Sequence, residues 1–276
     1  MLSKCNRRRR ARKGRIYGAL LWRHGARERR SVLGFCCCLD EMEPTSIREN
    51  LLRVKERIAE AARRARRNPE EITLIGVSKT HPASVIQEAF RAGLRHFGEN
   101  RVQEWEGKRA GLESVAATWH LIGHLQSNKA ARAARLFHSI DSVDDFALAQ
   151  RLDRARAESP SAEKLRVLIE VHLGGEETKS GVAESGLAEL AEKMAGLPRL
   201  DWAGLMCIPP FLEDPEQARP FFARLREWRT QLEARAGRKL PVLSMGMSRD
   251  FEAAILEGAT EVRVGTALFG SRGALR

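Results

Sequence analysis

A lysine closes the first strongly apolar run of the chain. The run 72–78 is rich in β-branched and apolar residues, and Lys79 follows it directly, with Thr80 and Pro82 just beyond. A lysine at the end of a buried strand is partly desolvated, which lowers the pKa of its ammonium and makes the neutral amine available. The neutral amine can form a Schiff base with a carbonyl compound. On this run alone, an ordinary strand-end lysine that reaches solvent along its aliphatic stem is the simpler interpretation.

Two later segments combine glycine with hydroxyl side chains. One is Ser244-Met-Gly-Met-Ser248, and the other is Gly265-Thr266 at the end of an apolar run. Exposed backbone N–H groups and hydroxyls of this kind bind phosphate, and parallel barrels commonly do so after their seventh and eighth strands. We therefore expect a phosphate subsite from Ser244, Ser248, Gly265 and Thr266, although turn and capping residues have the same composition.

Arg263 lies inside the last apolar run, where an arginine is costly unless it is paired. It could pair with a phosphate, point at a ring nitrogen, or face outward toward a helix. A Schiff-base lysine opposite a phosphate subsite describes a pyridoxal phosphate pocket.

His120 and His124 are four residues apart but span a strand and a loop, and no third ligand is evident. We expect no zinc site there, and expect His124 to be hydrogen-bonded.

Alternating apolar runs and helical patterns must position these residues. Each expected strand is followed by a helix or a helical start, which predicts a parallel sheet. Eight such units over about 230 residues fit a single-domain α/β fold, a (β/α)₈ barrel of the TIM type. An open doubly wound sheet is the alternative, weakened because no Gly-x-Gly-x-x-Gly follows the first strand. The expected strands are 72–78, 94–97, 118–122, 137–140, 165–172, 200–207, 241–244 and 261–264.

Two helix starts are marked by capping residues. An extra helix before the barrel should begin at Thr45 or Ser46 with Glu49 completing a capping box, and end near residue 67. Asp141 and Ser142 should cap the helix that ends near residue 158. The Gly174-Gly175 loop with Lys179 is expected to be a mobile lid or a turn without chemistry of its own.

The charge of the chain is concentrated in residues 1–39. That segment has ten Arg, two Lys and one acidic residue, whereas residues 40–276 have 36 basic and 35 acidic residues. We therefore expect no nucleic-acid partner for the body of the chain. Residues 1–41 could be a transit peptide or a basic arm for nucleic acid. Because Met42 directly precedes a natural domain start, we favour a disordered tail or an over-extended gene model, with 42–276 as the functional domain.

The cysteine content and the length of the apolar runs indicate the cellular compartment in which the protein works. Residues 40–276 contain one cysteine, Cys207, which cannot form a disulfide framework by itself and follows an apolar run. It is expected to be a buried small hydrophobe, and a reducing, cytoplasmic environment is expected for the protein. No apolar run reaches the roughly 18 residues of a membrane helix, so we expect no membrane partner.

Several motifs, in order along residues 45–272, resemble the pyridoxal phosphate homeostasis protein family. The Ser-Met-Gly-Met-Ser248 and His120-Leu-Ile-Gly-His-Leu-Gln126 stretches are the most specific. The resemblance implies a barrel like the N-terminal domain of bacterial alanine racemase, with pyridoxal 5′-phosphate bound covalently to Lys79. The other motifs are Gly76-Val-Ser-Lys79-Thr-His-Pro82, Phe97-Gly-Glu-Asn100-Arg101, Lys179-Ser-Gly181, Gly204-Leu-Met206-Cys-Ile-Pro209 and Val262-Arg-Val-Gly-Thr266.

The resemblance also assigns roles around the cofactor. It places Asn100 near the ring, Met206 in the pocket, Ser244, Ser248, Gly265 and Thr266 at the phosphate, and Arg263 at either the ring nitrogen or the phosphate. It implies a monomer that buffers or delivers the cofactor inside the cell, with apo forms of pyridoxal phosphate-dependent enzymes as candidate partners.

Efficient catalysis is not expected. A racemase needs acid–base groups on both faces of the substrate carbon, and in alanine racemase-like enzymes the second comes from another domain and another subunit. Only about ten residues follow the eighth strand, and the single tyrosine, Tyr17, lies in the basic segment. A cation at the ring nitrogen would also oppose its protonation. The alternative is a weak pyridoxal phosphate-dependent amino-acid racemase that uses the same Lys79.

Overall fold

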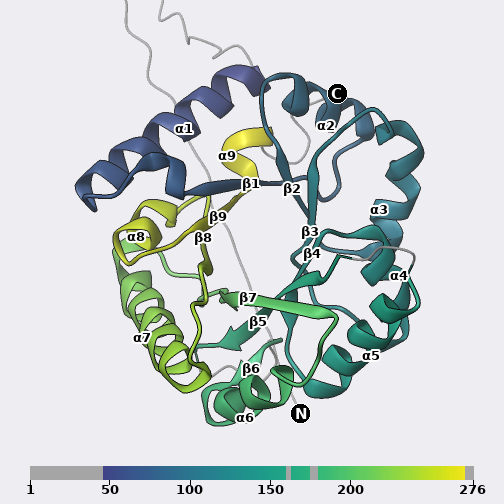
Figure 1. Ribbon diagram of the computed structural model, residues 1–276. Coiled ribbons are helices and arrows are strands. Elements are labelled where there is room, and N and C mark those ends of the chain that lie inside the picture. The colour runs from purple at the N-terminus through teal and green to yellow at the C-terminus, as the bar shows by residue number, and fades with distance from the viewer. Residues whose placement is uncertain (1–45, 160–162, 175–179, 271–276) are drawn as a thin grey trace, which may run out of the picture. The chain divides into compact units, whose positions relative to one another are not determined.

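The computed structural model describes residues 46–159, 163–174 and 180–270, and eight parallel strands of this part form a closed barrel (Figure 1). The ring runs β4-β3-β2-β1-β9-β8-β7-β5 and is closed by pairing of β4 with β5. The closed ring confirms the expected barrel and excludes the open doubly wound sheet. The strands are β1 (Thr73–Val77), β2 (His96–Glu99), β3 (Thr118–Leu121), β4 (Ser139–Val143), β5 (Leu165–His172), β7 (Leu200–Met206), β8 (Val242–Met247) and β9 (Glu261–Val264), and the two-residue β6 (Val182–Ala183) adds to the end of β5.

Helices surround the ring, as Figure 1 shows. Their apolar faces pack on the outward-facing side chains of the strands, which alternate with inward-facing ones. The helices are α1 (Ile47–Arg64), α2 (Ala83–Arg91), α3 (Val102–Arg109), α4 (Ala130–Leu136), α5 (Phe146–Ala157), α6 (Glu184–Met194), α7 (Arg219–Ala236), α8 (Phe251–Leu256) and α9 (Thr266–Phe269), with 3₁₀ turns at η1 (Pro69–Glu71), η2 (Ala110–Leu112), η3 (Ser127–Lys129) and η4 (Pro215–Ala218).

The first helix is the expected extra element outside the eight units. Ser46 accepts a hydrogen bond from the backbone N–H of Glu49, and the Glu49 carboxylate accepts one from the backbone N–H of Ser46, so the expected capping box is present. The apolar face of α1 packs against α8 and α9 (Figure 1). This contact ties the start of the barrel domain to the elements that follow its last two strands.

The inside of the barrel is more polar than the layer between strands and helices. One large apolar cluster occupies that outer layer, whereas the apolar cluster inside the ring consists of Leu168, Ala203 and Met206. Charged and hydroxyl side chains share the interior with it, including Arg263 and Glu170. Such groups are stable there only if they are hydrogen-bonded to one another.

Three strands end two or three residues later than expected, and β4 differs most. Asp141 and Ser142 were expected to cap the following helix, but both are fully buried within β4, and Asp145 caps α5 by accepting a hydrogen bond from the backbone N–H of Leu148 at 2.7 Å. Polar residues were interpreted as the end of the strand, yet the polar barrel interior accommodates them. β2 and β8 also run further than expected, to Glu99 and Met247.

None of the described helices is long and apolar enough to cross a membrane. Two interpretations lie outside the described residues: the proposed leader, residues 1–41, and Lys179 with its loop.

Candidate functional site

A cavity of about 530 Å³ opens at the carboxyl ends of β1, β8 and β9. Six of the eight residues expected at the site line its wall, namely Lys79, Asn100, Ser248, Arg263, Gly265 and Thr266. The other two, Met206 and Ser244, are fully buried and are not part of the wall. The topology of a parallel barrel thus brings together side chains that are up to 187 positions apart in the sequence.

Lys79 enters this cavity from the turn after β1 and is half-buried. The next residue, Thr80, has a positive φ of 67°. A β-branched residue is rarely found in this conformation, and such strain persists only where the surrounding contacts impose it. The backbone around Lys79 is therefore held in place by its neighbours.

The approach of β3 to Asn100 depends on a glycine. A Cβ atom at Gly123 would lie 2.5 Å from the backbone oxygen of Asn100, so only glycine fits without a backbone shift. This close packing places Asn100 and Ile122 in the same wall of the cavity.

Arg263 points into the barrel and is only 3% exposed, which excludes the outward-facing alternative. One terminal nitrogen donates to Ser244 Oγ at 2.7 Å, and the other donates to the backbone oxygen of Cys207 at 2.8 Å. The guanidinium is always charged, and two hydrogen bonds hold it at the cavity wall. Ser244 accepts the first of these hydrogen bonds, and its expected contact with a ligand stays a prediction.

Ser248 joins the two loops that were expected to bind phosphate. Its Oγ accepts hydrogen bonds from the backbone N–H groups of Gly265 at 3.2 Å and Ala267 at 3.5 Å. Gly246 precedes it with a positive φ of 91°, and a Cβ there would lie 2.6 Å from Ala254. The turn after β8 therefore brings a hydroxyl and two N–H donors together at the rim of the cavity.

The sequence pattern did not reveal three exposed apolar residues of the cavity wall. Ile208, Phe211 and Met247 line it and are exposed, with Phe211 at 76%. The Arg249 guanidinium lies 4.9 Å from the centre of the Phe211 ring and donates to the backbone oxygen of Glu213 at 3.1 Å. An exposed aromatic after Pro209-Pro210 was the available signal, but single exposed apolar residues are common on protein surfaces.

Cys207 is buried as expected, and His124 lies close to a carboxylate. Cys207 is fully buried, and burial raises the pKa of its thiol to about 12, so it is not a nucleophile at neutral pH. His124 is exposed and its Nδ1 lies 3.2 Å from Asp144 Oδ2. His120 faces the barrel interior instead, so the two histidines do not form a shared site.

Glu170 is a buried carboxylic acid near the end of β5. It is 3% exposed, and its Oε1 accepts a hydrogen bond from Ser180 at 3.4 Å, while Oε2 has no partner among the described residues. Burial raises the pKa of Glu170 to about 7, and the nearby Asp144 adds to the rise. No feature of the sequence distinguished this residue.

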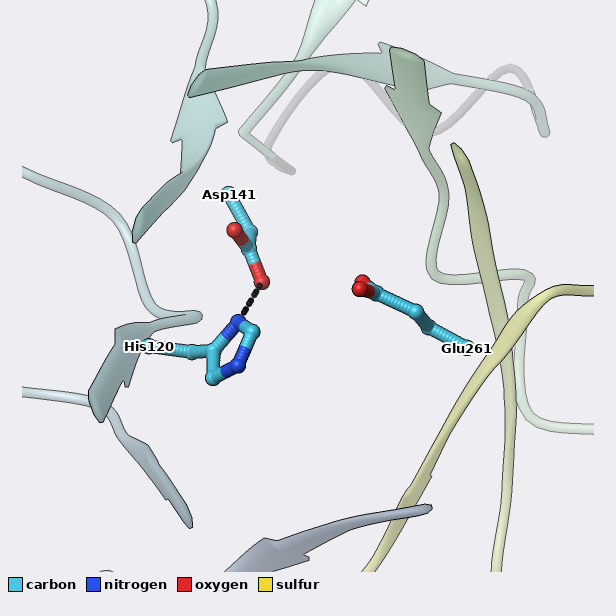
Figure 2. A group of neighbouring side chains, drawn as sticks. All are labelled: His120, Asp141 and Glu261. Carbon is cyan, nitrogen blue, oxygen red and sulfur yellow. Dashed lines mark hydrogen bonds and ion pairs between the residues drawn. The ribbon is translucent and has the colours of Figure 1, made fainter. Parts of the chain in front are cut away.

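A network of charged residues crosses the barrel near the amino ends of β5 and β9. Figure 2 shows His120 Nδ1 bonded to Asp141 Oδ2, 3.1 Å away, with the carboxylate of Glu261 directed toward the pair. His120 Nε2 lies 3.1 Å from His96 Nδ1, and Arg166 forms an ion pair with Glu261. One ligand atom from each of His120, Asp141 and Glu261 lies within 4.8 Å of the others. Both nitrogens of His120 are paired, and Arg166 supplies positive charge beside the carboxylates, so these groups stabilise one another, while Oε2 of Glu261 has no hydrogen-bond partner among the described residues.

A parallel barrel with a lysine after the first strand and a serine–glycine loop pair after the last two defines a class of domain. The family model of the alanine racemase N-terminal domain matches residues 47–273. Alanine racemase from Corynebacterium glutamicum has the same fold, with a TM-score of 0.59 and 18% identity over 83% of this chain and 63% of that chain.

Closer relatives identify the family within this class. The pyridoxal phosphate homeostasis protein of Aquifex aeolicus is 47% identical over 81% of this chain and 97% of its own, and that of Escherichia coli is 45% identical over 82% and 97%. PipY of Synechococcus elongatus, whose structure has pyridoxal phosphate bound, is 40% identical over 81% of this chain and 100% of its own, with a TM-score of 0.72. The chain belongs to the pyridoxal phosphate homeostasis protein family.

Proposed function

We propose that this protein binds pyridoxal 5′-phosphate as a Schiff base on Lys79 and serves in intracellular homeostasis of the cofactor without efficient catalysis. One observation carries the proposal: Lys79 shares a single cavity wall with Ser248, Gly265 and Thr266. The cofactor supplies an aldehyde that condenses with a lysine amine, with loss of one water, and a phosphate that needs hydrogen-bond donors.

The residues of the cavity fit both ends of this ligand. The N–H groups of Gly265 and Ala267 converge on Ser248 Oγ, which gives a donor-rich loop for a phosphate. Val77 and Ile122 contribute apolar surface to the same wall. A volume of about 530 Å³ lies within the usual range for small-molecule pockets. The names of the relatives and the cofactor in PipY support the same assignment.

Arg263 supports a carrier over a racemase. Its guanidinium is fixed at the wall by Ser244 and Cys207 and cannot lose its charge. If it faces the ring nitrogen, it opposes protonation there, and an unprotonated ring is a poorer electron sink. We propose that Arg263 faces the ring nitrogen and not the phosphate. The loops that carry Ser248 and Gly265 already supply hydrogen-bond donors for the phosphate.

Several finer assignments belong to the same proposal. Residues 42–276 would carry the function by themselves, acting as a cytoplasmic monomer that delivers the cofactor to apo forms of pyridoxal phosphate-dependent enzymes. The near-neutral charge of residues 40–276 and the buried Cys207 support this setting.

Absorbance spectroscopy tests the proposal. The purified protein incubated with pyridoxal phosphate and then freed of excess ligand should absorb near the violet edge of the visible spectrum. The band should be absent from Lys79→Ala, and borohydride reduction should attach the ligand to a peptide containing Lys79. A wild-type protein that shows no band, or a band that survives in Lys79→Ala, would overturn the assignment.

A further inference from the structure

A group of hydrogen-bonded polar residues lies behind the wall that carries Lys79. Gly98 of β2 faces the barrel interior, where a Cβ would meet Ile122 and Ile75. Its neighbour Glu99 therefore faces outward, toward α3. We call this group the Lys108 network; its members are Ser78, Thr80, Glu99, Glu104 and Lys108.

Lys108 on α3 is the centre of the network. Its Nζ donates to Glu104 Oε1 at 2.6 Å, to the backbone oxygen of Ser78 at 3.0 Å, and to the two oxygens of Glu99 at 3.1 and 3.2 Å. The side chain is only 12% exposed. An ammonium has three protons, so all of them are directed to groups of the protein.

Glu99 connects Lys108 to the residue before Lys79. Its carboxylate is fully buried, and Oε1 also accepts a hydrogen bond from Ser78 Oγ at 2.7 Å. Ser78 is thereby held through its hydroxyl by Glu99 and through its carbonyl by Lys108. A buried carboxylate requires such partners, because removing one leaves a charge without compensation.

Glu104 connects Lys108 to the residue after Lys79. Its Oε1 accepts hydrogen bonds from both Lys108 Nζ and the backbone N–H of Thr80. Thr80 is the residue with φ of 67°. The strained peptide that follows Lys79 is therefore held by Glu104, which is itself bonded to the ammonium that holds the peptide before Lys79.

We propose that Lys108 is a positioning residue for Lys79. By fixing Ser78 and Thr80 from outside the barrel, it sets the direction in which Lys79 enters the cavity. The inference rests on the proposed function, since it concerns how readily Lys79 reaches an aldehyde. Lys108 itself does not line the cavity, so it acts only through the backbone on either side of Lys79.

Binding of two ligands distinguishes a role of Lys108 in orienting Lys79 from a role in general stability. Pyridoxal phosphate reports on Lys79, whereas pyridoxine 5′-phosphate has the same ring and phosphate but no aldehyde. For Lys108→Met we expect affinity for pyridoxal phosphate to fall about tenfold or more, because small misplacements of a reacting group are costly. Affinity for pyridoxine 5′-phosphate should change by less than about twofold, because the phosphate loops are unaffected.

A double variant addresses the unpaired carboxylate that Lys108→Met leaves. In Lys108→Met/Glu99→Gln the buried charge is removed, so the melting temperature should recover, while pyridoxal phosphate affinity should stay low. Lys193→Met is the matched control, since Lys193 Nζ forms the same i, i+4 pair with Glu189 at 2.5 Å on the exposed side of α6. It should leave both affinities unchanged.

Three results would overturn the inference: unchanged pyridoxal phosphate affinity in Lys108→Met, an equal loss for both ligands, or recovery of that affinity together with stability in the double variant. Absence of the lysine-dependent band in the wild-type protein would be a different result. It would refute the proposed function before any variant is compared, and the positioning role with it.

Discussion

The guanidinium of Arg263 and the hydroxyl of Ser244 meet inside the barrel at 2.7 Å, from neighbouring strands β9 and β8. Ser244 has no exposed surface, so its contribution is to hold the arginine that reaches the cavity. Ser248, four residues later, lies in the wall itself and accepts from the backbone of the last loop. Two serines of one motif therefore have separate tasks.

Replacing each serine with alanine should separate these tasks. Ser244→Ala leaves a buried charged donor without its partner, and should lower the free energy of unfolding by about 1–3 kcal/mol. Ser248→Ala should destabilise less, because its half-buried loop can recruit water, but should weaken pyridoxal phosphate binding more. Urea unfolding and absorbance titration of both variants check this. If Ser248→Ala were the more destabilised variant and Ser244→Ala the weaker binder, the roles given to the two serines would be wrong.

The stability of the protein should depend on the protonation of Glu170. Because its folded-state pKa of about 7 lies above the ordinary 4.5, folding favours the neutral acid. Its contribution is complete below about pH 4.5 and is lost as the pH rises through about 7. The difference in free energy of unfolding between wild type and Glu170→Gln should therefore shift by on the order of 1–3 kcal/mol, in favour of the variant, between about pH 5 and about pH 8.

Denaturant unfolding at several pH values measures this difference. Glu158→Gln, at an exposed position of the same chain, serves as the control for the substitution itself. A difference for Glu170→Gln that does not change with pH would show that Glu170 titrates alike in the folded and unfolded protein.

Alanine should not be interconverted efficiently. Besides Lys79, the carboxylic acid among the described residues of the cavity wall is Asp250, and its Oδ1 is held by a hydrogen bond from the backbone N–H of Met247 at 2.6 Å. We expect turnover of L- or D-alanine by the loaded protein to remain below about 1 s⁻¹, the low end of typical enzyme rates. Following optical rotation with each enantiomer tests this. Faster turnover that requires Lys79 would favour the racemase.

A chain that begins at Met42 should bind pyridoxal phosphate as tightly as the full chain. The family model begins at residue 47, and every cavity residue lies beyond it. Any salt-dependent binding of nucleic acid should disappear with residues 1–41, which carry most of the net positive charge. Parallel titrations of both chains with the cofactor and with a DNA duplex check the two statements. Weaker cofactor binding by the shorter chain would assign the leader a role in the site.

Repetition of apolar runs and capping signals was sufficient to predict the barrel. Each of the eight expected runs became a barrel strand, because parallel strands covered on their outer face are strongly apolar. Strand ends were predicted less well. Asp141 and Ser142 follow the pattern of a helix start, and only the polar partners inside the barrel, such as His120, explain why the strand continues through them.

The site was predictable where residues follow strand ends and not where they act through distant partners. Lys79, Ser248 and Gly265 stand directly after apolar runs, so topology alone brings them together. Glu99 and Lys108 belong to a strand and a helix that read as ordinary amphipathic segments. Their shared contact with Ser78 depends on how α3 packs on β1 and β2, which no local pattern records.

The charged network of His120, Asp141, Arg166 and Glu261 has a consequence for how this sequence can change over time. Replacing Arg166 alone would leave the buried Glu261 carboxylate without its cation and lower the free energy of unfolding by about 3–5 kcal/mol. Replacing both residues with apolar ones of matching volume costs much less stability. Random single substitutions would thus be rejected while rare compensated pairs survive. Among members of the family, the residues at these positions should therefore change together. Covariation of these positions would then show how the sequences are related.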